Sequence, residues 1–281
     1  MNAVVYQDPG TMNDLYSLER GDAPLMISIP HLGTHIPDSL RGQYTDIALT
    51  VADTDWHLDR LYAFARSLGA TILGARVSRY VIDLNRPSND ESLYPGQTTT
   101  SLCPTETFRG APLYRDGCAP DAAERKRRVA TYWQPYHDTL RDELKRLRSL
   151  HPNVLLWEAH SIASVLPRLF DGKLSDLNIG TQDGRTAAAS VQEAAQRAAA
   201  SGPFTWIANG RFKGGFITRH FGAPHDGLHA VQLEMCQSTY MGEDAPFDYL
   251  PEMAEQVESV VRCMVGGALE ATVALNTASR G

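Results

Sequence analysis

The sequence predicts an α/β protein, because short apolar runs typical of buried strands alternate with longer segments of helical periodicity. Val154 to Ile162 opens with Val-Leu-Leu-Trp, which is apolar on both faces and too short for a typical helix, as expected of a central strand. Pro24 to Pro30 is a second apolar run, bracketed by prolines. Asp121 to Ser149 has apolar residues at helical spacing, and Pro135 is the expected break.

The remaining elements are predicted from the same patterns, and no internal repeat or linker divides residues 1–281, so we expect a single domain. Residues 88–120 are rich in Pro, Gly, Thr and Ser without periodicity, which predicts a long irregular loop of the functional kind. Further strands are predicted near Ala70 to Leu73, over Arg76 to Pro87, within Asp176 to Asp183 and over His229 to Tyr240; further helices are predicted from Asp53 or Thr54, over Gly184 to Ser201 and near Pro251 to Ala274.

Composition and charge exclude several classes of protein. A chain of 281 residues with 43% hydrophobic content can bury a large core, so it is not disordered. A net charge of -7 argues against a nucleic-acid or anionic-membrane partner, and no apolar run approaches the roughly 18 residues of a membrane span. The four cysteines show no C-x-x-C spacing and the N-terminus lacks a signal-peptide pattern, which predicts a reduced cytoplasmic protein.

Two histidines follow predicted strands, where ligands of open α/β sheets bind. His160 comes at the carboxyl end of the central strand, and His31 directly follows the Pro24 to Pro30 strand. Each alone is more often a structural histidine, but an aspartate facing both would complete a zinc site of two histidines and one carboxylate. We favour Asp55 as that carboxylate. Asp53 and Asp59 are the alternative carboxylates, and His35 is the alternative to His31.

Other polar residues suggest a pocket for a carboxylate substrate. Asn85 and Arg86 close a predicted strand and suit bidentate recognition of a carboxylate, although Arg79 or Arg86 could equally form a structural pair with Asp83. Glu234 lies at the carboxyl end of its strand, where it can be a general base or an ordinary solvent-facing residue. Glycines beside Arg211, Lys213 and Arg219 predict a local anion site on an acidic protein.

Six motifs in this order resemble the N-formylglutamate amidohydrolase family, and the resemblance covers nearly the whole chain. It implies a phosphorylase/hydrolase-like fold, related to zinc carboxypeptidases and aspartoacylases, with three α/β/α layers and a mixed, mostly parallel sheet. It also implies the last step of a histidine-degradation route, which gives L-glutamate and formate. The motifs are Ser-Ile-Pro-His-Leu-Gly-Thr-His-Ile-Pro (28–37), Asp-Thr-Asp-Trp-His (53–57), Ser-Arg-Tyr-Val-Ile-Asp-Leu-Asn-Arg-Pro (78–87), Glu-Ala-His-Ser-Ile (158–162), Asn-Gly-Arg-Phe-Lys-Gly-Gly (209–215) and His-Ala-Val-Gln-Leu-Glu-Met-Cys-Gln-Ser-Thr-Tyr (229–240).

The resemblance also implies roles for these residues, with one departure. Thr34 stands three residues after His31, where zinc carboxypeptidases have their glutamate ligand, so the carboxylate must come from elsewhere. We expect one Zn²⁺ per chain, although such ligands also accept Mn, Fe or Co. The implied roles are metal ligation by His31, Asp55 and His160, general base catalysis by Glu234, carbonyl stabilisation by Arg219 or His220, and carboxylate binding by Asn85, Arg86, Arg79 and Arg211.

Two other functions fit the same residues. One is a related metal-dependent amidohydrolase for another N-acylated acidic amino acid, as in the aspartoacylases; the other is a non-catalytic binder of small dicarboxylates. In each case the expected partner is a small molecule that carries carboxylates. The sequence leaves the oligomeric state open.

Overall fold

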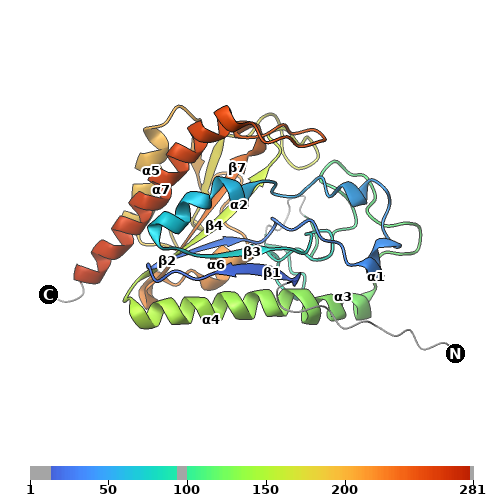
Figure 1. Cartoon of the computed structure of the whole chain (residues 1–281), viewed down its shortest axis with the longest axis horizontal. Coiled ribbons are helices and arrows are strands. Elements are labelled where there is room, and N and C mark those ends of the chain that lie inside the picture. The colour runs from blue at the N-terminus through green and yellow to red at the C-terminus, as the bar shows by residue number, and fades with distance from the viewer. Residues whose placement is uncertain (1–13, 94–99, 279–281) are drawn as a thin grey trace.

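A mixed seven-stranded sheet forms the middle layer of the part of the chain that the computed structural model describes, residues 14–93 and 100–278. The strands lie in the order β1-β3-β2-β4-β7-β5-β6 (Figure 1). Strands β3, β2, β4 and β7 run parallel, whereas β1 is antiparallel to β3 and β5 is antiparallel to β7. Their bounds are Tyr16–Glu19 (β1), Leu25–Ile29 (β2), Thr71–Ala75 (β3), Val154–Ile162 (β4), Leu177–Gly180 (β5), Trp206–Ala208 (β6) and Leu228–Cys236 (β7).

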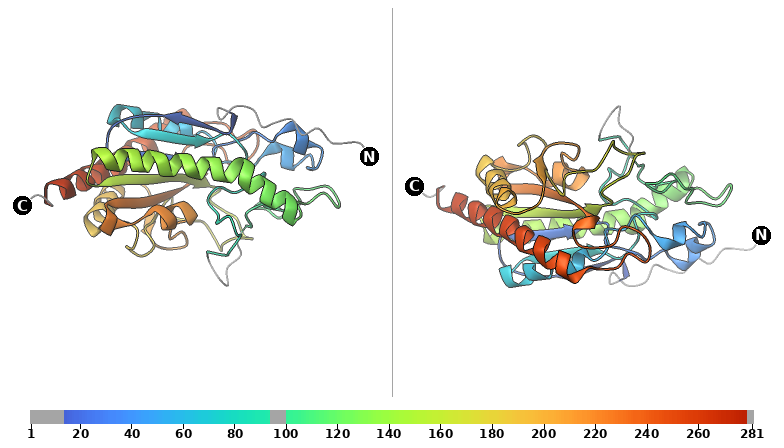
Figure 2. Two further views of the ribbon diagram at one scale, coloured as in Figure 1. Left: turned by 90° about the horizontal axis from the view of Figure 1, so that it is seen from below. Right: turned by 90° about the horizontal axis from the view of Figure 1, so that it is seen from above.

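Helices cover both faces of the sheet, which confirms the predicted three-layer α/β/α arrangement (Figure 2). Helix α4, Gln134–Leu150, runs along one face, and α5, Ala189–Ala200, packs with α7, Pro251–Ala278, on the other. The shorter helices are α1 (Asp38–Arg41), α2 (Leu58–Leu61), α3 (Ala122–Arg128) and α6 (Phe216–Phe221), with 3₁₀ segments at Ala48–Thr50, Ala63–Leu68, Pro224–Asp226 and Gln237–Thr239.

The side chains of strand β4 alternate between two cores, because successive residues of a strand point to opposite faces. Trp157 and Ala159 pack in the core that includes α5 and α7, whereas Leu156 packs in the core that includes α4. Glu158 and His160 follow Leu156 at every second position, so they lie on the α4 side of the sheet. The alternation that builds the core therefore also determines which polar residues meet at the end of the strand.

Two predicted strands agree closely with the structure, and one prediction is wrong. The runs Val154 to Ile162 and Pro24 to Pro30 form β4 and β2. The predicted strand over Arg76 to Pro87 is absent: β3 ends at Ala75 and turns follow it. This segment contains Tyr80, Val81 and Ile82, which are buried core residues. Apolar residues of this kind are favoured by burial as well as by strand pairing, so their presence does not by itself indicate a strand.

Helix boundaries also differ from the predictions. The helix predicted to begin at Asp53 or Thr54 begins at Leu58, and His57, with a left-handed φ of 61°, precedes it. Asp53 does not cap that helix, because its Oδ2 accepts a hydrogen bond from the backbone N–H of Phe108 at 2.7 Å. The alanine-rich helix begins at Ala189 instead of Gly184, and the closing helix extends to Ala278.

Pro135 interrupts the long amphipathic segment, as predicted. Helices α3 and α4 are joined by a π-helical segment, Val129–Trp133, which ends two residues before this proline. Proline lacks an N–H and its ring crowds the carbonyl four residues earlier, so a wider turn accommodates it. The apolar stripe predicted for this segment is buried in the core: Tyr132 in the π-helical segment, and Tyr136, Leu140, Leu144 and Leu147 in α4.

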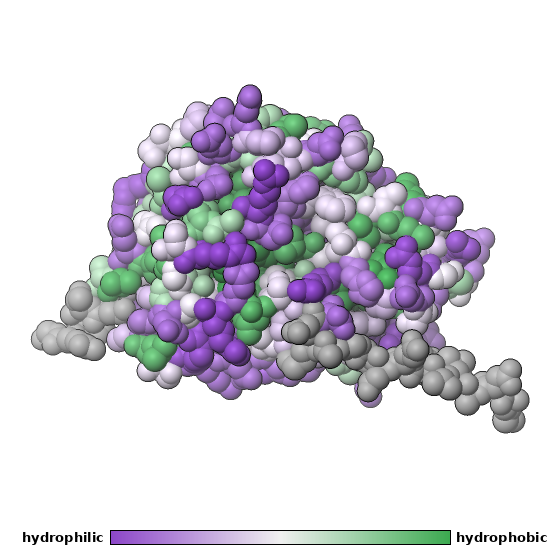
Figure 3. All heavy atoms as spheres, viewed as in Figure 1, coloured by the Kyte–Doolittle hydropathy of each residue, from purple (hydrophilic) through white to green (hydrophobic). Residues whose placement is uncertain are grey.

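The surface seen in Figure 3 is largely hydrophilic, with hydrophobic side chains in separate patches between polar ones. Of the helices in the described ranges, none combines the length and the apolar character that a bilayer span requires. Residues 94–99 of the predicted 88–120 loop lie outside the described part of the chain.

Candidate metal centre and substrate pocket

His31, Asp55 and His160 converge at the carboxyl ends of β2 and β4, from three distant parts of the sequence. One potential ligand atom of each lies within 4.8 Å of those of the other two. Asp55 Oδ2 lies 3.2 Å from His160 Nδ1 and 3.7 Å from His31 Nδ1, and the two imidazole rings are 4.9 Å apart. All three side chains are buried. The Nδ1 atoms therefore face a common point beside the carboxylate.

The donor set fits a divalent metal ion. Two imidazole nitrogens and a carboxylate oxygen are the protein ligands of many catalytic zinc sites, which leave a fourth position open. Asp55 Oδ1 is buried and has no hydrogen-bond partner among the described residues; Arg79 Nη1 lies 3.7 Å from it, beyond hydrogen-bond distance, so this oxygen can still accept a cation at closer range. Burial raises the pKa of Asp55, but hydrogen bonds with His160 and His31 outweigh burial and hold that pKa below its ordinary value.

Asp83 positions His31 from the side away from Asp55. Nε2–H of His31 donates to Asp83 Oδ1 at 2.7 Å, which leaves Nδ1 as the nitrogen that faces the cluster. Asp83 Oδ2 accepts a hydrogen bond from Arg79 Nη2 at 2.8 Å, and Oδ1 also accepts the backbone N–H of Asn85 at 2.9 Å. A carboxylate behind a ligating histidine fixes its tautomer and ring orientation. Asp83 thus determines how His31 is presented.

Glu158 stands behind His160 in a similar way, and Nε2 of His160 also has the Asn85 amide nitrogen 2.9 Å away. Glu158 and His160 are on the same face of β4, and Glu158 Oε1 lies 3.2 Å from His160 Nε2. Burial alone would lower the pKa of His160, but Asp55 on one side and Glu158 on the other raise it to about 10. The cluster therefore attracts positive charge, which a metal ion at Nδ1 would supply in place of a proton.

Arg79 lies against the cluster as a fixed cation. Its Nη1 is 3.7 Å from Asp55 Oδ1 and 3.2 Å from His31 Nδ1, while Nη2 is held by Asp83. The aromatic ring of Phe108 covers the guanidinium, with its centroid 4.6 Å from the guanidinium carbon. These contacts hold the side chain in one orientation beside the histidines.

Glu234 lies next to His160 on strand β7. The two residues are register partners in the parallel β4–β7 pair, and Glu234 lines a cavity that both histidines also line. Burial raises the pKa of Glu234, as do the nearby negative charges of Asp55 and Asp83, and against the lowering effect of His160 and Arg79 the pKa reaches about 8. A carboxyl group with a pKa near neutrality can accept and donate protons under ordinary conditions.

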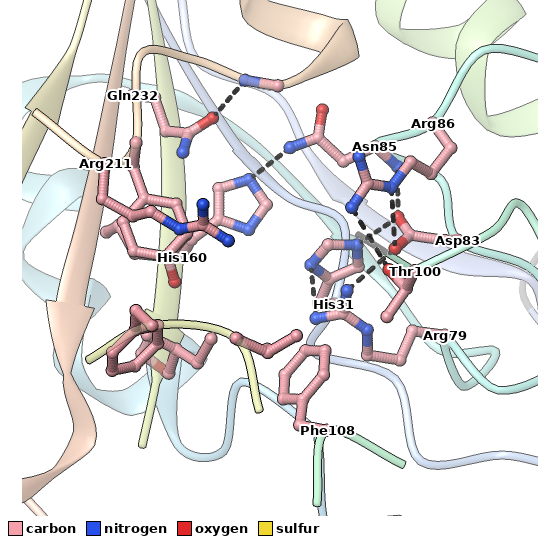
Figure 4. A pocket seen from close by; sticks show the side chains of 17 residues that line it. His31, Arg79, Asp83, Asn85, Arg86, Thr100, Phe108, His160, Arg211 and Gln232 are labelled. Carbon is pink, nitrogen blue, oxygen red and sulfur yellow. Dashed lines mark hydrogen bonds and ion pairs between the residues drawn. The ribbon is translucent and has the colours of Figure 1, made fainter. Parts of the chain in front are cut away.

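A cavity of about 100 Å³ opens beside the histidines, and it has a polar end and an apolar end. Figure 4 shows Asn85, Arg86 and Gln232 on one side of the two imidazoles, Phe108 on the other, and the guanidinium of Arg211 beside His160. The apolar end is lined by Phe108, Ile162, Leu169, Phe170 and Phe212. Asp55 is fully buried and does not line the cavity itself.

The polar end presents amide and guanidinium groups in fixed positions. Asn85 Oδ1 accepts the backbone N–H of Ile217 at 2.9 Å, so its Nδ2 points toward His160 at 2.9 Å and the pocket. Gly215 is required here, because a Cβ at this position would lie in hard contact with the Asn85 amide. Arg86 Nη2 donates to Thr100 Oγ1 at 3.2 Å, and Gln232 Oε1 accepts the Gly215 N–H at 2.7 Å.

The structure brings most of the predicted site residues together and places several elsewhere. Arg219 and His220 do not line the cavity among the described residues: Arg219 donates to the carbonyl oxygens of Gly214 and Leu93, and His220 is exposed and stacks on Phe216. Asp59 and His35 are exposed, and Asp53 binds the Phe108 backbone. The residues that meet at the site are His31, Asp55, His160, Glu234, Asn85, Arg86, Arg79 and Arg211.

Four further residues belong to the site, and the sequence points to them to different degrees. Asp83 is predicted only as the partner of an arginine; it pairs with Arg79 and also holds His31. The strand pattern places Glu158 beside His160 and Gln232 on the same side of its strand as Glu234, where both lie, but it assigns neither residue a role. No signal in the sequence points to Phe108, because it comes from the irregular loop.

Comparison with known proteins identifies relatives over the part of the chain that contains all the residues lining the pocket. The sequence model of the N-formylglutamate amidohydrolase family matches residues 23–241. A protein named N-formylglutamate deformylase from Pseudomonas aeruginosa is 49% identical over 253 residues, which cover 89% of this chain and 94% of that protein. Another of that name from Pseudomonas putida is 47% identical over 259 residues, with 92% and 97% coverage.

A solved structure agrees with the fold. The crystal structure titled N-formylglutamate amidohydrolase from Ralstonia eutropha superposes with a TM-score of 0.76 at 24% identity, and the match covers 92% of this chain and 97% of that one. The family match and the two relatives confirm the resemblance that the six motifs indicate. The chain therefore belongs to the N-formylglutamate amidohydrolase family.

Proposed function

We propose that this protein hydrolyses N-formyl-L-glutamate to L-glutamate and formate with one divalent metal ion per chain, of which zinc best matches the ligands. The names of the two Pseudomonas relatives support this substrate. The observation that carries the metal-dependent reaction is the convergence of His31 and His160 on Oδ2 of the buried Asp55 carboxylate, whose other oxygen has no hydrogen-bond partner among the described residues. A site that only bound a dicarboxylate has no need of such a cluster.

His31, Asp55 and His160 would hold the ion, and Asp83 and Glu158 would fix the two imidazole rings behind it. When bound, a divalent ion supplies Lewis-acid polarisation of the formyl carbonyl and lowers the pKa of water. Mn, Fe or Co could occupy the same ligands, since imidazole and carboxylate accept several divalent metals.

Glu234 is the proposed general base. It takes a proton from the attacking water and delivers that proton to the glutamate nitrogen as the C–N bond breaks. Its position opposite His160 and its pKa of about 8 support this role, because one group must be able both to accept and to release the proton. Positive charge gained by the metal cluster would lower this pKa toward neutral pH.

Arg79 is the proposed stabiliser of the carbonyl oxygen, in place of Arg219 and His220. It is the guanidinium beside Asp55 and His31, and Asp83 and Phe108 hold it in place before substrate arrives. Preorganised positive charge is most effective where water is excluded, and Arg79 is buried. Arg219 instead ties together the carbonyls of Gly214 and Leu93.

Asn85, Arg86 and Arg211 are the proposed ligands of the two substrate carboxylates. All three line the cavity, Asn85 and Arg86 at its polar end and Arg211 beside His160, and the guanidinium fork matches two carboxylate oxygens. The proposed reaction would be the last step of a histidine-degradation route. The four cysteines, all of them unpaired thiols, support our proposal that the protein works in the reducing cytoplasm.

The test is formate release from N-formyl-L-glutamate, compared with acyl group release from N-acetyl-L-glutamate and N-acetyl-L-aspartate, before and after removal of metal by a chelator. We expect formate release, loss on chelation and recovery with zinc. Faster turnover of N-acetyl-L-aspartate would favour the aspartoacylase-like alternative. A protein without stoichiometric metal that binds N-formyl-L-glutamate but releases no formate would be the dicarboxylate binder.

A further inference from the structure

A second cavity of about 130 Å³ lies behind the apolar end of the substrate pocket. It shares two lining residues with the pocket, Phe108 and Ile162, and is otherwise lined by different residues. Both side chains are nearly inaccessible to solvent, at 8% and 5% exposure, although each borders two cavities. The two side chains therefore form a thin wall between two empty spaces.

Ile162 stands two residues after His160 in strand β4, so its side chain leaves the same face of the sheet about 7 Å further along. Phe108 meets it from the 100–120 region of the chain, and together with Leu166 they form a small hydrophobic cluster. Leu166 lines only the second cavity. The wall is thus packed from behind as well as from the pocket side.

The Phe108 ring is held in place by contacts of its backbone and its neighbours. The backbone N–H of Phe108 donates to Asp53 Oδ2 at 2.7 Å, and the carbonyl of Thr107 accepts a hydrogen bond from Arg168 Nη1 at 3.2 Å. On the pocket side the ring lies over the guanidinium of Arg79. Phe108 is therefore a fixed part of the pocket wall.

The order of groups in the pocket assigns this wall to one side of the substrate. The proposed carboxylate-binding groups Asn85 and Arg86 lie on one side of His31 and His160, and Phe108 lies on the other, with Arg211 beside His160 (Figure 4). A scissile carbonyl at the histidines, with the carboxylates at the polar end, must direct its acyl substituent toward Phe108. In the formyl group that substituent is a single hydrogen atom.

We infer that Phe108 and Ile162 are the residues that restrict this enzyme to the formyl group, by closing off a second cavity that would otherwise admit longer acyl chains. This inference rests on the proposed function. A hydrophobic wall discriminates by excluding volume, and each methylene that it rejects is worth about 10- to 200-fold in kcat/KM. Removal of the Phe108 ring would join a cavity of 130 Å³ to one of 100 Å³.

The experiment compares N-formyl-, N-acetyl- and N-butanoyl-L-glutamate as substrates of the unaltered protein and of Phe108→Ala, Phe108→Leu and Phe170→Ala. Phe170 is the matched control, because this phenylalanine lines the pocket but not the second cavity. The readout is the ratio of kcat/KM for each longer acyl substrate to kcat/KM for the formyl substrate, which is insensitive to loss of active protein.

We expect Phe108→Ala to raise the butanoyl-to-formyl ratio by at least about tenfold. Phe108→Leu, which keeps most of the packing, should raise the acetyl ratio more than the butanoyl ratio, and Phe170→Ala should change both ratios less. Equal changes in the Phe108 and Phe170 variants would overturn the inference. So would unchanged acetyl and butanoyl ratios in both Phe108 variants, because the wall would then not face the acyl group.

The unaltered protein separates this inference from the proposed function. If it releases no formate from N-formyl-L-glutamate, the proposed function is wrong and the assignment of the wall falls with it. If it does release formate and neither Phe108 variant gains activity on longer acyl groups, the proposed function stands and the wall is not the specificity determinant.

Discussion

Asp83 Oδ1 accepts a hydrogen bond from His31 Nε2 at 2.7 Å, while the other oxygen of the same carboxylate accepts one from Arg79 at 2.8 Å. A single buried side chain therefore orients both a proposed metal ligand and the proposed carbonyl-stabilising cation. Burial raises the pKa of Asp83, but the charges of His31 and Arg79 hold it well below the ordinary value, so Asp83 is an anion at neutral pH.

Asp83→Asn should weaken metal binding by about 10- to 100-fold, as outer-shell carboxylate replacements commonly do. An amide has only one acceptor oxygen, so either His31 or Arg79 would then face an N–H donor. The measurement is competition for zinc against a chromophoric chelator. Asp138→Asn, on the exposed side of α4, is the control. Equal zinc affinity in the two variants would contradict the role of Asp83.

Glu234→Gln should retain its metal while kcat falls by about 10²- to 10⁴-fold, because the amide cannot accept the proton of water. Metal content is measured by elemental analysis, and kcat by formate release. Glu255→Gln, at an exposed position of α7, controls for the charge change. Turnover close to that of the unaltered protein would show that another group is the base.

Gly215→Ala should raise KM for N-formyl-L-glutamate, since the added methyl group must displace the Asn85 amide that faces the pocket. The matched control is Gly42→Ala, because a Cβ at residue 42 meets nothing within 4 Å and its backbone is right-handed helical. Steady-state kinetics and thermal melting of both variants provide the comparison. An unchanged KM in folded Gly215→Ala would exclude Asn85 from substrate binding.

Stability should fall as the pH drops from about 6.5 toward 3, partly because of His137. Burial lowers the pKa of this residue to about 3; it donates Nε2–H to the Leu84 carbonyl at 2.8 Å and stacks on Trp133. The unfolded chain binds a proton near pH 6.5, so in this window it holds more protons than the folded chain. Each pH unit then costs about 1.4 kcal/mol of unfolding free energy per such histidine.

Urea denaturation at a series of pH values measures this slope. His137→Gln should have a shallower slope between pH 6 and 4 than the unaltered protein, even though it is less stable at pH 7. His225→Gln, at an exposed position, serves as the control. An unchanged slope in His137→Gln would show that other groups carry the acid sensitivity.

The main strands and the position of His160 could be predicted because the signal was local. Val-Leu-Leu-Trp followed by polar residues describes a buried strand that ends at a site, and β4 has those bounds. The Arg76 to Pro87 segment misled because its apolar residues are buried in turns, and composition reports burial without reporting backbone pairing. Buried positions and strand positions favour the same apolar residues, although burial and strand pairing are separate properties.

The choice among Asp53, Asp55 and Asp59 illustrates where local reasoning ends. All three are aspartates within seven residues, yet one faces the histidines, one binds a loop and one is exposed. Their directions depend on how the 51–57 segment packs across β2 and β4, which is a long-range contact. The position of Phe108 cannot be predicted for the same reason, because its hydrogen bond with Asp53 joins residues 55 positions apart in the sequence.

The alternation of β4 and β7 has a consequence for how this pocket can change. His160 and Glu234 reach the cavity because their side chains leave the face of the sheet on which the cavity lies. Inserting one residue before either of them within its strand would turn that side chain to the opposite face, into the hydrophobic core under α5 and α7. New specificities must therefore come from exchanged side chains or from remodelled loops such as the one that carries Phe108. Neither strand can gain or lose an odd number of residues before its site residue without turning that residue away from the cavity.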